Sequence, residues 1–191
     1  MNPFGVTVHC SDAADFTIPD DVDVVFVDPA RRDPNAAKDS IGNTKRIFDP
    51  NLWSPSWESI NRIASAHPVI AKVAPGIDKA DIDEWDARWI SSDGDLVECF
   101  LNSAGTGIRA AVLIDSSHEA STEVMGNSIT NTSPIGKFLI VPDPALIRAS
   151  ALDAVANLCN GGLVNEHIAW LTSDDAGAVS ELATQSPSLA S

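Results

Sequence analysis

A short apolar run that stops at an Asp-Pro pair limits what this chain can fold into more than any other feature. Residues 24–27 (VVFV) are β-branched or aromatic, and Asp28 and Pro29 follow directly. Such a run is typical of a strand buried on both faces of a parallel sheet. Proline has no N–H to donate to the ladder, so the strand must stop or leave the sheet there. Ligands of open α/β sheets bind beyond the carboxyl ends of strands, so we expect Asp28 at a ligand-binding edge.

Two arginines follow the same predicted strand. Arg31 and Arg32 belong to the only basic cluster of the sequence, together with Lys38, Lys45 and Arg46. Arginine can hold a phosphate or a carboxylate through two parallel hydrogen bonds, which predicts substrate binding by Arg31 and Arg32. The alternative is an ordinary solvated loop after a hydrophobic strand, and the motif by itself does not decide between the two interpretations.

A helix and a second apolar strand come next. Ser54 and Pro55 predict a helix start, with serine as N-cap and proline at the first helical position. Apolar residues at helical spacing follow, and the helix must end before Pro68. Residues 69–73 (VIAKV) predict a second buried strand that ends at residues 74–76 (APG). Strand, helix and strand together predict a right-handed parallel βαβ unit.

Lys72 is unusual within that second apolar strand. It can be an edge lysine whose stem packs on apolar surface while its ammonium reaches solvent. Alternatively, its ammonium lies beside the site as a partner of Asp28. Both interpretations stay open at this point.

The segments on either side of the first motif carry further candidates. Residues 6–9 (VTVH) predict a short strand, and Asp12 and Asp15 follow it in a loop or a first helical turn. These carboxylates can cap a turn, or can stand at the ligand edge of the sheet. Residues 33–55 show no periodicity, and a loop of this length is uncommon unless it is functional, so a lid or substrate loop is predicted there.

The middle of the chain predicts three more strands, at residues 89–91, 98–101 and 109–114. Asp93-Gly94 and residues 105–107 (GTG) supply the turns between them. We expect the last two strands to form an antiparallel hairpin at the end of the sheet. The glycines do not match a dinucleotide-binding fingerprint and do not open a helix, so no phosphate loop is predicted.

The C-terminal part is predicted to be small and incomplete. Residues 116–135 form a polar linker between a domain at 1–115 and a segment at 136–191. That segment begins with a strand at 138–141 and one helix, capped by Asp143, that runs to Cys159. The remainder is predicted to be weakly structured, and the region is too short to build its own core.

Composition bounds the functional class. The chain has 191 residues and a net charge of −15, which counts against general nucleic-acid binding by the whole surface. It has no run of 18 apolar residues and no N-terminal signal pattern, so we expect no membrane span and a cytoplasmic location. The 3 cysteines and 4 histidines are scattered, so neither a disulfide framework nor a metal site is predicted.

Seven stretches together carry a family resemblance. In chain order they read VDPARRD, FDPNLWSP, VIAKVAPGID, WISSDGDLVE, IRAAVLI, VPDPALIRASALDAVANL and HIAWLTSD. In this order they resemble bacterial class I S-adenosylmethionine-dependent methyltransferases that carry a C-terminal THUMP-like domain. The last two stretches correspond to the start of that domain, and the resemblance covers most of residues 6–175.

The resemblance implies an α/β fold and a function. The sheet would be part of a Rossmann-like methyltransferase sheet of order 3-2-1-4-5-7-6, mostly parallel with an antiparallel strand at the end, followed by a small incomplete α+β segment. Residues 6–9, 23–27 and 69–73 would be its third, fourth and fifth strands, and the expected hairpin its sixth and seventh. The implied reaction is methyl transfer from S-adenosylmethionine, with RNA as the acceptor of the complete protein.

The resemblance also assigns residues to the site. Asp12 and Ala13 would approach the adenine of the cofactor. Asp28 and Pro29 would match the DPP-type or NPP-type motif beside the methyl group, with Ala30 in place of its second proline. Asp28, Pro29 and Lys72 are thus the predicted catalytic residues, and Arg31 and Arg32 the substrate-binding pair.

The chain departs from the family in its first part. The glycine-rich loop that holds the methionine moiety and the acidic residue that holds the ribose are absent from the sequence. We therefore expect an internal portion of a longer enzyme that lacks two strand-helix units, about 60 residues. Without these neighbours, the strand at 6–9 should slide beside the strand at 23–27 or be poorly held. The competing hypothesis is a non-catalytic remnant or binding module that does not bind the cofactor, and a different nucleotide-binding α/β domain ranks last.

Overall fold

A computed structural model describes residues 5–32, 44, 46–115, 121–127, 131–175, 179 and 182–187. The chain forms two compact units, Met1–Val69 and Ile70–Ser191. The first unit contains strand β1 (Val25–Val27), the 3-10 helix η1 (Pro50–Leu52) and helix α1 (Trp57–Ala64). The boundary falls at the start of β2 (Val69–Val73), and the Val25 N–H donates to Pro68 O at 2.9 Å.

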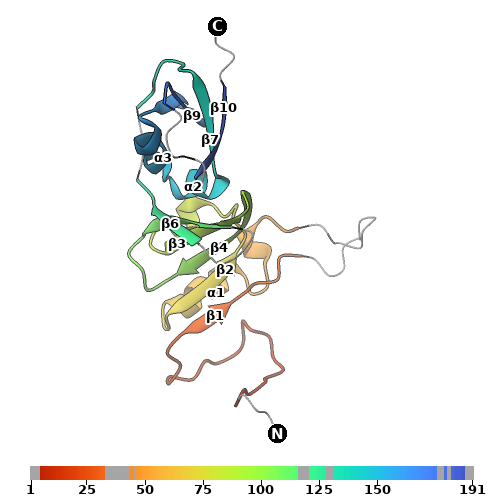
Figure 1. Ribbon diagram of the computed structural model, residues 1–191. Helices are drawn as coiled ribbons and strands as arrows, with labels where there is room; N and C mark the ends of the chain where they lie inside the picture. Colours follow the sequence, from red (N-terminus) through yellow and green to blue (C-terminus); the bar gives the residue numbers. More distant parts are fainter. Residues whose placement is uncertain are drawn as a thin grey trace. The chain divides into compact units, whose positions relative to one another are not determined.

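One six-stranded sheet has the order β1-β2-β4-β3-β5-β6 (Figure 1). Its remaining strands are β3 (Asp86–Ser92), β4 (Asp95–Asn102), β5 (Arg109–Ile114) and β6 (Ser121–Met125). β2 and β3 are both antiparallel to β4, and β5 is parallel to β3, so β2, β3 and β5 run in one direction. β6 is antiparallel to β5 at the end of the sheet. The predicted α/β class, with an antiparallel strand at the end, is confirmed.

One hairpin of this sheet uses other strands than the predicted ones. It joins β3 to β4 through Asp93 and Gly94, whose φ angles are 51° and 83°. A two-residue turn with positive φ at both positions matches the twist of the flanking strands, and Asp-Gly is among its preferred sequences. β5 instead pairs in parallel with β3, so the predicted hairpin of residues 98–101 with 109–114 is wrong.

The first strand predicted from the sequence is also wrong. Residues 6–9 form no strand, and the side chains of Val6 and Val8 are 58% and 87% exposed. The sheet ends at β1, so residues 6–9 do not slide beside β1, and their exposure agrees with the other expected outcome, a poorly held segment. Nor is β1 buried on both faces, because Val24 and Phe26 are 51% and 60% exposed.

Helix α1 begins slightly later than predicted. Ser56 is its N-cap, and its Oγ accepts the Ser59 N–H at 3.2 Å, whereas the predicted cap, Ser54, precedes Pro55 through a cis peptide bond. Trp57 and Ile60 are buried, and the helix ends before Pro68 as expected.

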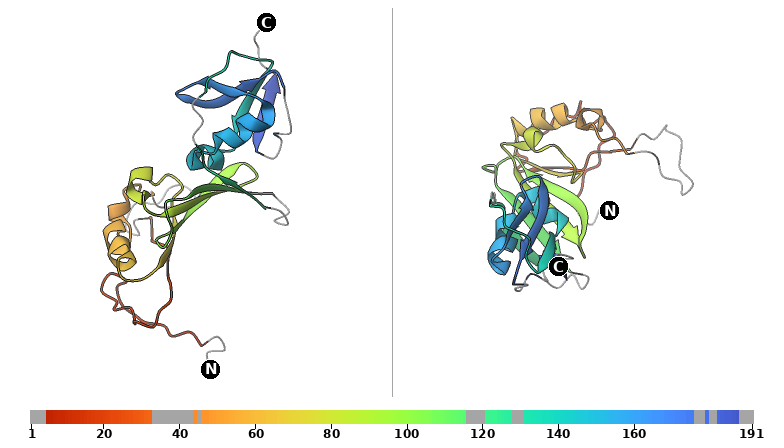
Figure 2. Two further views of the ribbon diagram at one scale, coloured as in Figure 1. Left: turned by 90° about the vertical axis from the view of Figure 1, so that its left-hand side faces the viewer. Right: turned by 90° about the horizontal axis from the view of Figure 1, so that it is seen from above.

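The C-terminal part of the second unit has a four-stranded antiparallel sheet of order β10-β7-β9-β8. Its strands are β7 (Phe138–Pro142), β8 (Gly162–Asn165), β9 (Ile168–Ser173) and β10 (Ala183–Pro187). Helices α2 (Pro144–Ala149) and α3 (Leu152–Cys159) follow β7, and α3 contacts β9 (Figure 2). Ser150, in the left-handed region with φ 58°, separates the two helices.

Three predictions for this part are therefore corrected. The expected single helix is two helices, because Asp143 caps only α2 and the chain turns at Ser150. The tail that was predicted to be weakly structured contains three strands, and Ile140, Leu146, Val155 and Leu171 are fully buried, so the region has its own core. The predicted linker at 116–135 contains β6, whose mostly polar and exposed side chains hid it in the sequence.

Candidate functional site

The predicted site residues around Asp28 lie on an extended segment. From residue 24 to residue 32, every even-numbered side chain is exposed, and every odd-numbered one is partly or fully buried. A period of two is that of an extended chain, in which alternate side chains share a face. Asp28 and Arg32 therefore share the exposed face, while Pro29 and Arg31 point to the other side.

Asp28 stands where β1 ends. Val27 and Pro29 on either side of it are buried, which fixes the backbone and presents the Asp28 carboxylate outward. After Pro29 the chain pairs again, since Ala30 and Ser54 exchange backbone hydrogen bonds of 2.8 and 3.1 Å. The geometry gives the exposed carboxylate that the prediction requires, and the catalytic role of Asp28 and Pro29 stays a prediction.

Arg32 has Arg46, not Arg31, as its neighbour on the same face. Arg32 and Arg46 are directly opposite in an isolated antiparallel bridge, and the Ile47 N–H donates to Arg31 O at 2.9 Å. Arg31 is turned away, so the two adjacent arginines do not share a face. Their role in substrate binding stays a prediction, to which the structure adds Arg46.

The predicted lid is described only in part. Residues 33–43 and 45 lie outside the described residues. The rest returns along residues 30–32 and then forms η1, and the buried Trp53 donates its indole N–H to Ile47 O at 3.0 Å. This returning segment is therefore packed through Trp53.

Asp12 takes part in a local turn. Its Oδ1 accepts the Ala14 N–H at 2.9 Å, and its carbonyl accepts the Asp15 N–H at 3.2 Å. Arg62, near the end of α1, donates to Ala14 O at 2.6 Å and holds this turn in place. Asp12 and Ala13 are exposed, so the turn does not exclude a ligand contact, and their contact with the cofactor stays a prediction.

Lys72 has a carboxylate neighbour on the adjacent strand. Its Nζ lies 3.8 Å from Glu98 Oε2, and the two side chains are 30% and 29% exposed. Lys72 is directly opposite Phe100, so Glu98 is its diagonal neighbour across the pair. β2 lies inside the sheet, so the interpretation as an edge lysine is wrong, while the catalytic one stays a prediction.

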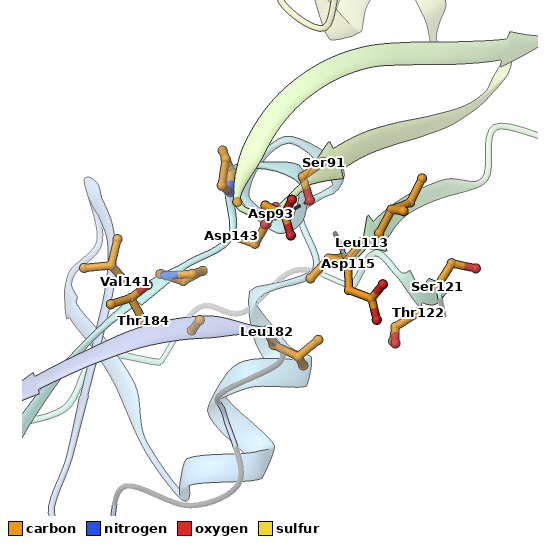
Figure 3. Close-up of a pocket in the computed structure, with 15 residues that line it drawn as sticks. Ser91, Asp93, Leu113, Asp115, Ser121, Thr122, Val141, Asp143, Leu182 and Thr184 are labelled. Carbon is orange, nitrogen blue, oxygen red and sulfur yellow. Dashed lines mark hydrogen bonds between the residues drawn. The ribbon is translucent and has the colours of Figure 1, made fainter. Parts of the chain in front are cut away.

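An acidic cleft that the sequence did not predict opens at the carboxyl ends of β3 and β5 (Figure 3). Its volume is about 660 Å³, and Asp93 and Asp115, each following one of these strands, line it. Asp143, the N-cap of α2, also lines it and accepts hydrogen bonds from Ser91 Oγ at 2.9 Å and Ala145 N at 2.7 Å. Both Asp93 and Asp115 directly follow strands that the sequence predicts. The sequence did not predict that these strands are neighbours, because it paired the strand at 109–114 with the one at 98–101 instead.

Residues 75–79, which follow β2, contact α2 and Trp89 of β3. The Trp89 indole donates to Pro75 O at 3.1 Å, and Lys79 and Arg148 lie 5.9 and 5.6 Å from the Trp89 ring centre. Lys79 donates to Ser150 Oγ at 2.8 Å. Burial, and next the positive charges of Arg148 and Arg109, lower the pKa of Lys79. These contacts hold residues 75–79 against α2.

The glycine-rich turn before β5 is filled by a carboxylate of the chain itself. Asp86 is buried and accepts the Thr106 and Ile108 N–H groups, both at 2.8 Å. These are the backbone groups that an anion would need, so the turn is not available as a phosphate loop. Burial raises the pKa of the Cys99 thiol to about 12, so this cysteine is inert.

No group of three or more histidine, cysteine, aspartate or glutamate side chains that could hold a metal ion occurs within the described residues. None of the helices that they form has the length and apolar character needed to cross a membrane.

Comparison with known proteins connects this geometry to a family of folds. No family model matches the chain. Two curated relatives, both named uncharacterized S-adenosylmethionine-dependent methyltransferase, come from Mycobacterium tuberculosis strains CDC 1551 / Oshkosh and ATCC 25618 / H37Rv. Each is 28% identical over 159 residues, which cover 79% of this chain and 41% of the relative.

A solved structure matches as well. It is a crystal structure of a "putative methyltransferase" from Porphyromonas gingivalis W83, 16% identical, with a TM-score of 0.57 over 86% of this chain and 43% of that one. The chain has a methyltransferase-like α/β fold. It spans less than half the length of these relatives.

Proposed function

We propose that this chain is part of an S-adenosylmethionine-dependent methyltransferase and that the complete protein methylates RNA. The names of the Mycobacterium tuberculosis relatives and the methyltransferase-like fold support the reaction class. Within the chain, the observation that carries the proposal is the exposed Asp28 carboxylate, which stands where β1 ends against a buried proline. The RNA acceptor rests on the resemblance of residues 141–174 to a THUMP-like domain.

The residues of this chain fit one side of the cofactor. Asp12 is exposed, and only Oδ1 takes part in its turn, which leaves acceptor capacity for an amino group such as that of adenine. When bound, S-adenosylmethionine supplies an activated methyl group on its sulfonium. Asp28 accepts a hydrogen bond from the amine or hydroxyl of the acceptor and orients it for in-line attack.

Calorimetric titration of the 191-residue chain with S-adenosylmethionine tests this proposal. We expect saturable binding of S-adenosylmethionine and none of adenosine triphosphate, because the chain offers carboxylates and no phosphate loop at its candidate site. Circular dichroism of the same sample establishes that the protein is folded. A folded chain that binds adenosine triphosphate and not S-adenosylmethionine would contradict the proposal and favour a different nucleotide-binding domain.

The second candidate function is a non-catalytic binding module. The sequence feature that favours it is the lack of a glycine-rich cofactor loop within these 191 residues. A folded chain that binds neither ligand in the titration would favour this candidate.

A further inference from the structure

We infer that Arg32, Arg46 and Phe48 form a binding patch for single-stranded nucleic acid. The two guanidinium groups hold a backbone phosphate, and the Phe48 ring stacks on a neighbouring base. The inference rests on the proposed function, whose acceptor it specifies as single-stranded, and it gives Arg46 and Phe48, two residues of the predicted substrate loop, a specific role.

The first argument is the opposition of two like charges. Arg32 and Arg46 are directly opposite in an antiparallel bridge, where side chains on one face lie close together and like charges repel. Both side chains are exposed, and within the described part of the chain neither forms an ion pair. Arg32 uses Nη1 to donate to Thr44 O, which leaves its other N–H groups available. An anion between the two guanidinium groups removes the repulsion, and phosphate matches their geometry.

The second argument is the exposed aromatic ring beside this pair. Exposure alternates along residues 46–48, with Arg46 and Phe48 exposed and Ile47 partly buried. The Ile47 backbone is fixed on both sides, because its N–H donates to Arg31 O and its carbonyl accepts the Trp53 indole. Phe48 therefore shares the face of Arg46, and it is 82% exposed. Contact between an exposed apolar ring and water is unfavourable, and a base stacked on the ring removes its apolar face from water.

The third argument concerns the length of the ligand. Asp28 and Arg32 share a face but are four residues apart in an extended segment, a span of about 13 Å at the usual rise per residue. A ligand that meets both Asp28 and the arginine pair must therefore be extended. A polynucleotide meets this requirement, and a free phosphate does not.

The overall charge restricts the interaction to this patch. With a net charge of −15, the rest of the surface repels a polyanion, so binding should be weak away from the arginine pair and strongly dependent on salt. Single-stranded contacts of this kind combine local cations with a stacking ring and read little sequence. Oligouridylate is a suitable probe because its bases stack weakly on one another and leave the strand open.

Fluorescence anisotropy with a short fluorescein-labelled oligouridylate tests the inference on the folded chain, without cofactor. We expect Phe48→Ala to weaken binding at least about fivefold, the lower end for loss of one stacked base. Arg46→Gln should weaken binding and reduce the slope of log affinity against log salt by about 0.7, as for one lost phosphate contact. Arg88→Gln and Leu52→Ala are the controls, since they remove a half-exposed charge paired with Glu123 and an exposed apolar side chain outside the patch, and both should bind as the wild type does.

Three results would overturn the inference. They are no binding of oligouridylate by the folded chain, wild-type affinity in both Arg46→Gln and Phe48→Ala, and competition by uridine monophosphate as strong as that by the oligomer. The assay is independent of the titration with S-adenosylmethionine. Cofactor binding without oligouridylate binding removes the patch and leaves the proposed methyltransferase, whereas patch-dependent oligouridylate binding without cofactor binding supports the patch and favours the non-catalytic binding module.

Discussion

The two units of the chain differ in where their apolar side chains lie. Of the largest fully buried side chains among the described residues, only Ile60 and Val69 belong to Met1–Val69, and the others belong to Ile70–Ser191. Both units also expose large apolar side chains, and in the first unit, which has few buried ones, these are Val6, Val8, Val24, Phe26, Phe48 and Leu52. Stability is therefore concentrated in the second unit, and the predicted chemistry is concentrated in the first.

This difference has a physical basis in the sheet. β1 has three residues and is an edge strand, so one side of its ladder and the face of Val24 and Phe26 remain uncovered by the described chain. The strands of the second unit are longer and have partners on both sides except at the ends, and β3, β4 and β5 contact α2. Substitution of a site residue on this open face should change the free energy of unfolding little. Effects on function can therefore be measured without a loss of stability.

The largest effect should come from Trp89, at the centre of the second unit. Trp89→Ala removes a fully buried ring, its hydrogen bond to Pro75 O and the surface on which Lys79 and Arg148 lie. We expect a loss of about 3–5 kcal/mol in the free energy of unfolding, measured by urea denaturation. Trp170→Ala, at a ring that is 47% exposed, is the control and should cost much less. Equal losses would contradict the placement of the core.

A medium effect should come from the turn that Asp86 fills. A Cβ at Gly105 would lie 2.2 Å from Asp86 Cγ, so Gly105→Ala must displace this carboxylate from the Thr106 and Ile108 N–H groups. We expect a loss of about 1–3 kcal/mol, the usual cost of overpacking. A Cβ at Gly76 would meet nothing within 4 Å, so Gly76→Ala should leave the unfolding midpoint unchanged or slightly raised. A neutral Gly105→Ala would show that the turn is looser than its contacts indicate.

Features that depend on neighbouring residues could be predicted from the sequence, and features that depend on distant residues could not. The α/β class, β2, β7 and the Asp143 cap were predictable, because each depends on a few adjacent residues with a clear apolar run or capping pattern. The partner of β5, and β6 itself, were not predictable, since register depends on residues far apart and an edge strand can be polar. The strands β8, β9 and β10 were not predicted for the same reason.

The candidate site divides in a similar way. Asp28 at the end of a strand was predictable, because a strand followed by proline must stop. The pairing of Arg32 with Arg46 was not predictable, because the two residues are far apart in the sequence and only the return of the chain along residues 30–32 brings them together. The Asp93 and Asp115 edge was hidden by the wrong hairpin, although both residues directly follow predicted strands.

The smallest effect should come from the open face of the first unit. Val24→Ser changes a side chain that is 51% exposed, so we expect the free energy of unfolding to change by less than about 0.5 kcal/mol. Val73→Ser is the matched control, because it makes the same change at a fully buried position in β2. Val73→Ser should cost at least about 2 kcal/mol, through lost apolar burial and a buried hydroxyl. Urea denaturation of both variants measures the difference, and a cost at Val24 close to that at Val73 would mean that the face is covered in solution.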